Sequence, residues 1–390
     1  MSEWKKVKLG EVAEIFSGYA FKSSEMNKES GTPLIKIKNI NNFGVSKNCD
    51  TYLNKDVDLN KYKRFKLQEI DFLVAMTGQG SVGRIGKMKS FTPNFYVNQR
   101  VAIVRPDRET CEPYYAYLSV ATNERQDELF NKANGAGQPN ISAKQIGELE
   151  INLPSLPTQH RIATILSRYD SMIENYQKQI KLLEEAAQRL YKEWFVDLHF
   201  PGHENTKIID GVPEGWENMS ITDVFDFKYG KILPTKDFVA DGTIPVYGAS
   251  KQIGRYTKAN CFEPKVLVGS RGNAGFVHRT IENETYVTNN SFIVNPLKKY
   301  DYLKLPFIYE SFRMLDFVAI CTGAAQPQLT LNSIASLKYL VPAKNLIISY
   351  CDTTNSYFSK IAMAYKQIRT LTEARNRLLP KLMSGEINVE

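Results

Sequence analysis

Residues that build metal sites and disulfide scaffolds are scarce in this sequence of 390 residues. Its five cysteines are widely spaced and form no Cys-x-x-Cys pair, which indicates neither a disulfide framework nor a zinc site. His199 and His203 stand four residues apart, but Pro201 and Gly202 between them break the helix that a metal-binding pair needs. We therefore expect no metal in this chain.

Long apolar runs are missing as well. No run approaches the ~18 apolar residues of a membrane helix, and residues 1–6 lack the apolar core of a signal peptide. We expect a cytoplasmic protein with no membrane segment. Hydrophobic residues make up 43% and charged residues 24% of the chain, which is typical of a globular protein and excludes large-scale disorder.

Catalytic motifs are also absent from the sequence. It holds no Walker loop G-x-x-x-x-G-K-[ST], no G-x-S-x-G elbow, no H-E-x-x-H and no Asn-Pro-Pro-aromatic signature of amino methyltransferases. This absence argues against an enzyme. The alternative is a nuclease or methyltransferase whose motif has an unfamiliar form.

An internal repeat, by contrast, organises the whole chain. Residues 135–141 (GAGQPNI) return as residues 323–329 (GAAQPQL), 188 positions later, and the match continues without a gap to residues 366–368. Upstream, the offset drifts through 190 and 194 to 212, as loops of different length require. Trp4, Val12 and Gly18 then correspond to Trp216, Val224 and Gly230. Since 390 residues exceed what one core usually serves, the repeat predicts two similar domains.

A long helix is expected after each copy of the repeat. Apolar residues step by four and three from Ile162 to Trp194, which is the heptad seam of a coiled coil, and a matching seam falls 188 positions later. Pro380 is expected to kink or end the second helix. The alternative is that each seam packs only on its own domain. The helix-pairing positions are Ile162, Leu166, Tyr169, Ile173, Ile180, Leu183 and Leu190, with Tyr357, Ile361, Ile368, Leu371 and Leu378 in the second helix.

Connectivity favours an antiparallel helix pair, because the second domain starts soon after the first helix ends and no segment supplies the return path of a parallel pair. Strand-like runs and helical stretches in each copy predict mixed α/β domains. The expected strands are residues 33–37, 71–76, 98–104, 265–269 and 291–294, and the expected helices are residues 114–129 and 305–320.

The fold class that follows is α+β or mixed. Two similar α/β domains are separated by a pair of long antiparallel coiled-coil helices, with a pseudo-twofold internal repeat. The expected boundaries are residues 1–155 for the first domain, 156–198 for the first helix, 199–342 for the linker and second domain, and 343–390 for the second helix and the C-terminal tail.

Basic residues outnumber acidic ones, 50 against 42, and the net charge of +8 suits a polyanionic partner. Residues 78–83 match G-x-G-x-x-G, but residues 84–89 have no helical face, so we favour a glycine-rich β-hairpin over a dinucleotide site. Glycine lets a backbone approach phosphates closely, and Arg and Lys neutralise them. The candidate DNA contacts of this hairpin are Gly78, Gly80, Arg84, Lys87 and Lys89, with Arg271, Asn273 and Arg279 in the second copy.

A second basic cluster interleaves cations and aromatic residues. Residues 61–66 (KYKRFK) contain a basic-Tyr-x-basic pattern that survives at residues 255–258 (RYTK). Such a stretch can grip phosphates, although a charge run is more often a solvated face. Its candidate DNA contacts are Lys61, Lys63, Arg64, Lys66, Arg255 and Lys258.

Amide and guanidinium side chains occur at matching places in the two copies. Arg100 suits the edge of guanine, as Asn and Gln suit adenine, so residues 98–100 and 289–290 are candidate readers of bases. Their position in an expected strand makes a structural role equally plausible. Gln138 and Gln326, each beside a proline, are expected to fix turns rather than to read bases.

Several motifs lie at fixed places in this layout: Trp4 with Leu9 and Val12 at the start, LPSLPTQHRIA at residues 153–163, LYKEWFVD at residues 190–197 and LLPKLMSGE at residues 378–386. With the repeat, they make the chain resemble the DNA-specificity (S) subunits of type I restriction-modification enzymes. The resemblance covers nearly the full length of the chain.

The resemblance implies a non-catalytic subunit with two target-recognition domains, each reading one half of a bipartite double-stranded DNA target. It also implies two copies of a DNA methyltransferase subunit as partners, and restriction and translocase subunits beside them. S-adenosylmethionine, Mg and ATP would then belong to these partners, and this chain would hold no cofactor. The alternative from the residues alone is a coiled-coil scaffold with two protein-binding domains, for which the positive charge is incidental.

Overall fold

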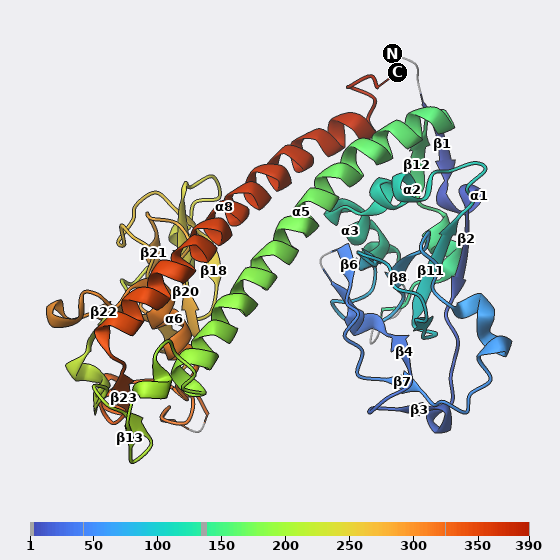
Figure 1. Cartoon of the computed structure of the whole chain (residues 1–390). Helices are drawn as coiled ribbons and strands as arrows, with labels where there is room; N and C mark the ends of the chain where they lie inside the picture. Colours follow the sequence, from blue (N-terminus) through green and yellow to red (C-terminus); the bar gives the residue numbers. More distant parts are fainter. Residues whose placement is uncertain (1–3, 42, 134–138, 324, 390) are drawn as a thin grey trace. The chain divides into compact units, whose positions relative to one another are not determined.

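The computed structural model describes residues 4–41, 43–133, 139–323 and 325–389 (Figure 1). The chain divides into two compact units, unit 1 with Met1–Ser171 and Leu371–Glu390, and unit 2 with Met172–Thr370. In the part of the chain that is described, no helix is both long enough and apolar enough to span a membrane.

Unit 1 is built on a six-stranded sheet with the order β2-β11-β8-β9-β6-β5, a four-stranded sheet with the order β10-β4-β7-β3 and the pair β1-β12. Its strands are β1 (Lys5–Lys8), β2 (Ala13–Ser17), β3 (Met26–Asn27), β4 (Thr32–Ile35), β5 (Ile40–Asn41), β6 (Phe43–Val45), β7 (Tyr52–Leu53), β8 (Phe72–Ala75), β9 (Ile85–Lys87), β10 (Tyr96–Val97), β11 (Val101–Pro106) and β12 (Glu150–Leu153). Its short helices are α1 (Leu9–Val12), α2 (Pro113–Val120), α3 (Asn123–Lys132) and α4 (Ala143–Gly147).

Unit 2 repeats this plan with fewer strands. Its sheets have the orders β16-β22-β19-β20, β18-β17-β21 and β15-β23, with a separate hairpin β13-β14. The strands are β13 (Ile208–Ile209), β14 (Val212–Pro213), β15 (Glu217–Ser220), β16 (Phe225–Tyr229), β17 (Ile244–Tyr247), β18 (Gln252–Tyr256), β19 (Val266–Gly269), β20 (Val277–Arg279), β21 (Tyr286–Val287), β22 (Ser291–Pro296) and β23 (Lys338–Val341), and the short helices are α6 (Leu305–Arg313) and α7 (Leu331–Ala335).

The sequence repeat is thus a repeat of sheets. The order β2-β11-β8-β9 of unit 1 returns as β16-β22-β19-β20 of unit 2. Local signals repeat with it: Ser142 caps α4 by accepting from the Gln145 amide, and Thr330, 188 positions later, caps α7 by accepting from the Ser333 amide. The mixed α/β character predicted from the sequence is confirmed.

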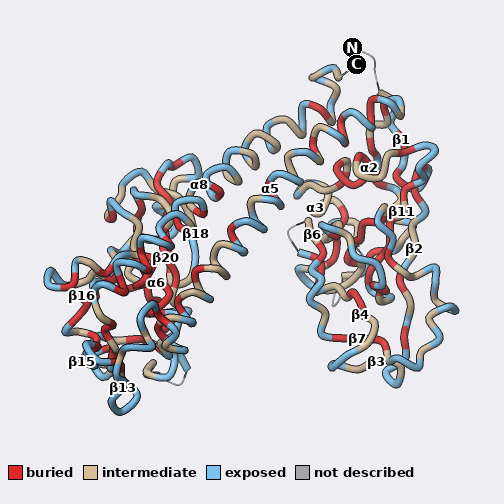
Figure 2. The backbone as a smooth tube through the Cα atoms, viewed as in Figure 1, coloured by how far each residue is buried: buried red, intermediate tan, exposed pale blue. Residues whose placement is uncertain are grey.

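The central strands carry the core of each unit. Buried residues gather among the strands of each unit (Figure 2). All four residues of β8 and all four residues of β19 are buried, as the continuous apolar runs of their sequences require. Both expected glycine-rich hairpins are present, because β8 pairs antiparallel with β9 and β19 pairs antiparallel with β20.

Two long helices, α5 (Leu156–Tyr191) and α8 (Lys344–Met383), follow the two sets of sheets. Within unit 2, Ile180 of α5 packs with Ile361 and Ala364 of α8 in one buried apolar cluster. The Tyr350 hydroxyl donates to the Ala187 carbonyl at 3.0 Å. Within unit 1, Leu166 and Leu382 are both buried in the core. Also within unit 1, Arg375 of α8 pairs with Asp170 of α5 at 2.5 Å, so side chains of the two helices contact each other in each unit.

The other predicted seam residues are all at least partly covered. Ile162 and Ile173 are buried, and Leu190 packs against the core of unit 2. The remaining positions, partly buried, are Tyr169, Leu183, Tyr357, Ile368, Leu371 and Leu378.

Four boundaries differ from the sequence prediction. Pro380 does not end α8, which continues to Met383, because one missing amide near a helix end costs a single hydrogen bond. Residues 114–129 form two helices, since Thr122 caps α3 by accepting from the Arg125 amide. The expected helix 305–320 ends at Arg313 with α6, and the expected strand 98–104 begins at Val101 with β11.

Close backbone approach at Gly18 and Gly230 suggests a test of the repeat. A Cβ atom at either position would overlap the carbonyl oxygens of residues 97–98 or 287–288. We expect Gly18→Ala and Gly230→Ala each to lower the free energy of unfolding by about 2 kcal/mol, because the strands must separate to admit a methyl group. Urea unfolding measures the change. Gly147→Ala is the control, since the added Cβ would lie 3.5 Å from the Gly10 Cα; equal losses in all three variants would contradict the prediction.

Candidate nucleic-acid interface

Four chain segments of unit 2 lie side by side where the strands of the main sheet end. The Asn289 amide donates to the Lys231 carbonyl at 3.2 Å, and the Ser270 amide donates to the Asn290 carbonyl at 2.7 Å. The backbones of Arg271 and Gln328 in turn form an isolated antiparallel β-bridge. We call residues 231–232, 289–290, 270–273 and 328 the loop row of unit 2.

Unit 1 has the same loop row at the corresponding positions. The Gln99 amide donates to the Tyr19 carbonyl at 3.0 Å, and the Met76 amide donates to the Arg100 carbonyl at 2.9 Å. The backbones of Thr77 and Asn140 form an isolated antiparallel β-bridge. The loop row of unit 1 consists of residues 19–20, 98–100, 76–80 and 140.

The backbone hydrogen bonds described above recur at matching positions of the two rows, and one more pair agrees. The Tyr19 amide donates to Val97 and the Lys231 amide to Val287, at 2.9 and 3.0 Å. The repeated turn that follows each helical stretch is only partly visible here, because residues 135–138 and 324 lie outside the described residues.

The size of the row suits a DNA groove. Neighbouring segments of a sheet lie ~4.8 Å apart, so four of them span roughly 14 Å. The major groove of B-DNA is ~12 Å wide and presents hydrogen-bonding base edges. A row of this width can place side chains from several segments in one groove.

Predicted contacts that the structure brings into the rows are Gly78, Gly80 and Arg100 in unit 1 and Arg271 and Asn273 in unit 2. Arg100, Arg271 and Asn273 are exposed. Gly78 and Gly80 have φ angles of 106° and 70°, a backbone conformation that favours glycine. The side-chain amide of Asn273 donates to the Ser250 hydroxyl at 2.7 Å, which ties the tip of the β17-β18 hairpin to the row.

Three predicted contacts belong to the hairpins but lie away from their turns. Lys87, Lys89 and Arg279 follow or end the second strand of each hairpin, and a strand rises ~3.3 Å per residue away from the turn. The Lys87 ammonium donates to the Glu69 carbonyl at 2.5 Å, and burial lowers its pKa. Lys89 is exposed beyond the end of β9.

Arg279 is not a surface cation, and its burial and partners argue against the predicted role as a DNA contact. Its side chain is 6% exposed and pairs with Glu184 of α5 at 3.0 Å. The guanidinium also lies over the rings of Tyr309 and Phe358, 4.8 and 4.4 Å from their centroids. These contacts compensate for its burial and tie β20 to the helices of unit 2.

The basic-aromatic stretch of unit 1 lies in a 3-10 helix, Leu59–Phe65. Its Tyr62 ring lies 4.6 Å from the ring of Tyr19, beside the loop row. Arg64 pairs with Glu14 at 2.6 Å, and Lys61 lies 3.8 Å from Asp58. Of the predicted contacts in this stretch, Lys61, Lys63 and Arg64 are exposed and Lys66 is half-buried.

The remaining predicted contacts are separate from the rows. Arg84 donates to the Asn41 side chain at 3.0 Å, and Arg255 donates to the Gly242 carbonyl at 3.3 Å. Lys258 is exposed after the end of β18. None of the three shares a backbone hydrogen bond with a row segment among those of the described residues.

The candidate DNA contacts predicted from the sequence did not include Lys231, Ile232 and Ser250. Lys231 and Ile232 are both exposed. They directly follow Gly230, and the match of Gly230 with Gly18 in the repeat is the sequence signal that could have identified them. Ser250 occupies the tip of a hairpin that the expected strands did not include.

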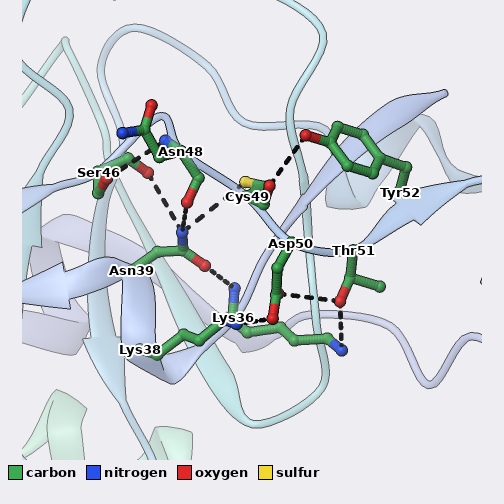
Figure 3. Close-up of polar contacts among 9 residues, drawn as sticks. All are labelled: Lys36, Lys38, Asn39, Ser46, Asn48, Cys49, Asp50, Thr51 and Tyr52. Atoms are coloured by element: carbon green, nitrogen blue, oxygen red, sulfur yellow. Dashed lines mark hydrogen bonds and ion pairs between the residues drawn. The ribbon is translucent and has the colours of Figure 1, made fainter. Parts of the chain in front are cut away.

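Unit 1 differs from unit 2 by an insert between β4 and β7. Asn39 organises it by accepting from the Lys36 amide at 2.9 Å and donating to the Asn48 carbonyl at 3.0 Å (Figure 3). The Lys36 ammonium donates to Thr51, and Lys38 pairs with Asp50. Burial, more than the neighbouring lysines, lowers the pKa of Lys36. These lysines therefore hold the insert together.

In the described part of the chain, no three His, Cys, Asp or Glu side chains are grouped so that they could hold a metal ion.

Comparison with known families matches both copies of the repeat. The family model described as "Type I restriction modification DNA specificity domain" covers residues 1–185 and 213–347. This chain belongs to that family. Members of the family recognise DNA targets, so the duplicated loop row belongs to a duplicated specificity domain.

Individual relatives agree over long stretches. The chain is 25% identical over 344 residues to the MjaIX specificity subunit of Methanocaldococcus jannaschii, covering 81% of this chain and 78% of that one. It is 21% identical to the HindI specificity subunit of Haemophilus influenzae, covering 99% and 100%. The crystal structure of the type I S subunit from M. genitalium has a similar fold, with a TM-score of 0.63, 20% identity and coverage of 97% and 96%.

The exposed cations of the loop row yield a salt-dependence test. We expect Lys231→Ala and Arg271→Ala each to weaken binding of duplex DNA several-fold and to lower the slope of log K against log salt by about 0.9, because one phosphate contact releases about one counterion. Fluorescence anisotropy at several salt concentrations measures this slope. Lys338→Ala, an exposed cation on β23, is the control. An unchanged slope in both row variants would exclude phosphate contacts there.

Proposed function

We propose that this chain is the DNA-specificity subunit of a type I restriction-modification complex, and that each unit reads one half of a bipartite DNA target. The observation that carries the proposal is the duplicated loop row, which has the same backbone bonds in both units but different side chains. Identical frames with different side chains are what two different half-sites require.

The subunit acts without chemistry of its own in this proposal. Its sequence has no catalytic motif, so methyl transfer falls to two copies of a methyltransferase subunit that supply S-adenosylmethionine. Restriction and translocase subunits, with ATP and Mg, would join the same complex. The setting of such a complex is the cytoplasm, where its DNA substrate lies.

The two long helices would form an antiparallel coiled coil that sets the spacing between half-sites. The heptad seam of both helices supports this, as does the apolar cluster around Ile180 and Ile361. The proposed boundaries remain residues 1–155 for the first recognition domain and 156–198 for the first spacer helix. Residues 199–342 form the linker and the second recognition domain, and residues 343–390 form the second spacer helix and the tail, in a pseudo-twofold arrangement.

Exchange of one recognition domain tests the division into half-sites. We expect replacement of residues 1–150 by the matching segment of a relative to change one half of the methylated sequence and to leave the other half intact. Sequencing of methylated sites in cells that carry the complex reads both halves. A simultaneous change in both halves would contradict modular recognition, and methylation by the isolated chain with S-adenosylmethionine would contradict the non-catalytic role.

Lengthening the helices tests their role as a spacer. One heptad added after Leu183 and one after Leu371 keeps the seam in register and adds roughly 10 Å of helix. We expect a preferred spacer about three base pairs longer, at ~3.4 Å per base pair, with unchanged half-sites, or lost binding where DNA twisting costs too much. Full activity at the original spacer, measured by the same sequencing, would show that the helices do not set the distance.

A further inference from the structure

An isoleucine in the loop row of unit 2 has no apolar cover. Ile232 is 75% exposed, the largest value among the exposed large hydrophobic residues of the described chain. Leaving a side chain of this size in water forgoes the stabilisation that burial would bring. Single exposed apolar residues are common on protein surfaces, so the exposure of Ile232 is informative only together with its place in the loop row of unit 2.

The backbone of Ile232 is held firmly in place. The Tyr286 hydroxyl donates to the Ile232 carbonyl at 3.1 Å. One residue earlier, the Lys231 amide donates to Val287 at 3.0 Å, and Gly230 donates to Ser291 at 3.1 Å. The exposed side chain therefore projects from a fixed segment, and a fixed position is what specific contact with a base requires.

The neighbours of Ile232 in the row are polar and suited to DNA. Lys231 and Asn290 are exposed on adjacent segments, and Arg271 follows on the next one. The corresponding position of unit 1, 212 residues earlier, is Ala20, which is also exposed. The two units thus present different apolar groups at the same place in the same frame.

We propose that Ile232 is a specificity-determining residue that contacts the C5-methyl group of a thymine in the half-site read by unit 2. This inference rests on the proposed function and deepens it. Thymine is distinguished in the major groove by its methyl group, which apolar side chains recognise by contact. Lys231, Asn290 and Arg271 would bind phosphates and base edges around this contact.

The test removes the methyl group from the DNA. Full-length chain assembled with its methyltransferase subunits is titrated with duplexes in which each thymine of the unit 2 half-site is replaced singly by uracil, which lacks only the methyl group. We expect one replacement to weaken binding by roughly fourfold, as loss of one buried methyl group implies. For Ile232→Ala we expect equal binding of the thymine and uracil duplexes at that position, and for Ile232→Val we expect most of the difference to remain.

Ile209→Ala is the matched control, because Ile209 is 63% exposed in the β13-β14 hairpin, outside the row. It should keep the wild-type preference for thymine. The proposal is overturned by a half-site without thymine, by wild-type binding that ignores every replacement, or by an Ile232→Ala variant that still prefers thymine. Failure of the proposed function is a separate outcome, seen as absence of salt-dependent, sequence-specific binding by the wild-type complex.

Discussion

In each unit a glycine lies in close contact with the turn that precedes β11 or β22. The rest of the unit depends on this constraint. In unit 1, Gly18 passes against the backbone of residues 97–98, and in unit 2, Gly230 passes against residues 287–288. No side chain fits there. Because the glycine lets these segments meet, the next residues can exchange backbone hydrogen bonds, and each loop row is assembled from that point outward.

A row held by backbone bonds leaves its side chains free to differ. Unit 1 presents Ala20 and Arg100 where unit 2 presents Ile232 and Asn290, while the bonds beneath them are the same. Buried backbone groups must be paired in any folded protein, and here that pairing also supplies the frame of each row. Under the proposed function, a change of specificity would need new side chains only, because the backbone bonds of the frame stay in place.

The end of the hairpin that lies away from its turn has different partners in the two units. In unit 1 the insert adds β6 beside β9, and Lys87 binds backbone carbonyls. Among the described residues of unit 2, β20 is the edge strand of the sheet, and Arg279 instead pairs with Glu184 of α5. A lysine and an arginine at matching positions thus stabilise two different edges. Both residues lie at the end of the second strand of the hairpin, away from its turn, and both have partners within their own unit.

The sequence by itself determined the duplication, the buried strands, the glycine hairpins and the two long helices, because periodicity and repeated turn residues are local properties of the chain. It also indicated the family through motifs spread over both copies. It placed Gly78, Arg100, Arg271 and Asn273 among the candidate contacts, but it could not separate them from Lys87 or Arg279. That separation depends on which strand end each residue occupies and on partners such as Glu184, which is 95 positions from Arg279 in the chain. The loop rows and the exposed place of Ile232 arise from backbone bonds between distant segments, and only the tertiary structure decided them.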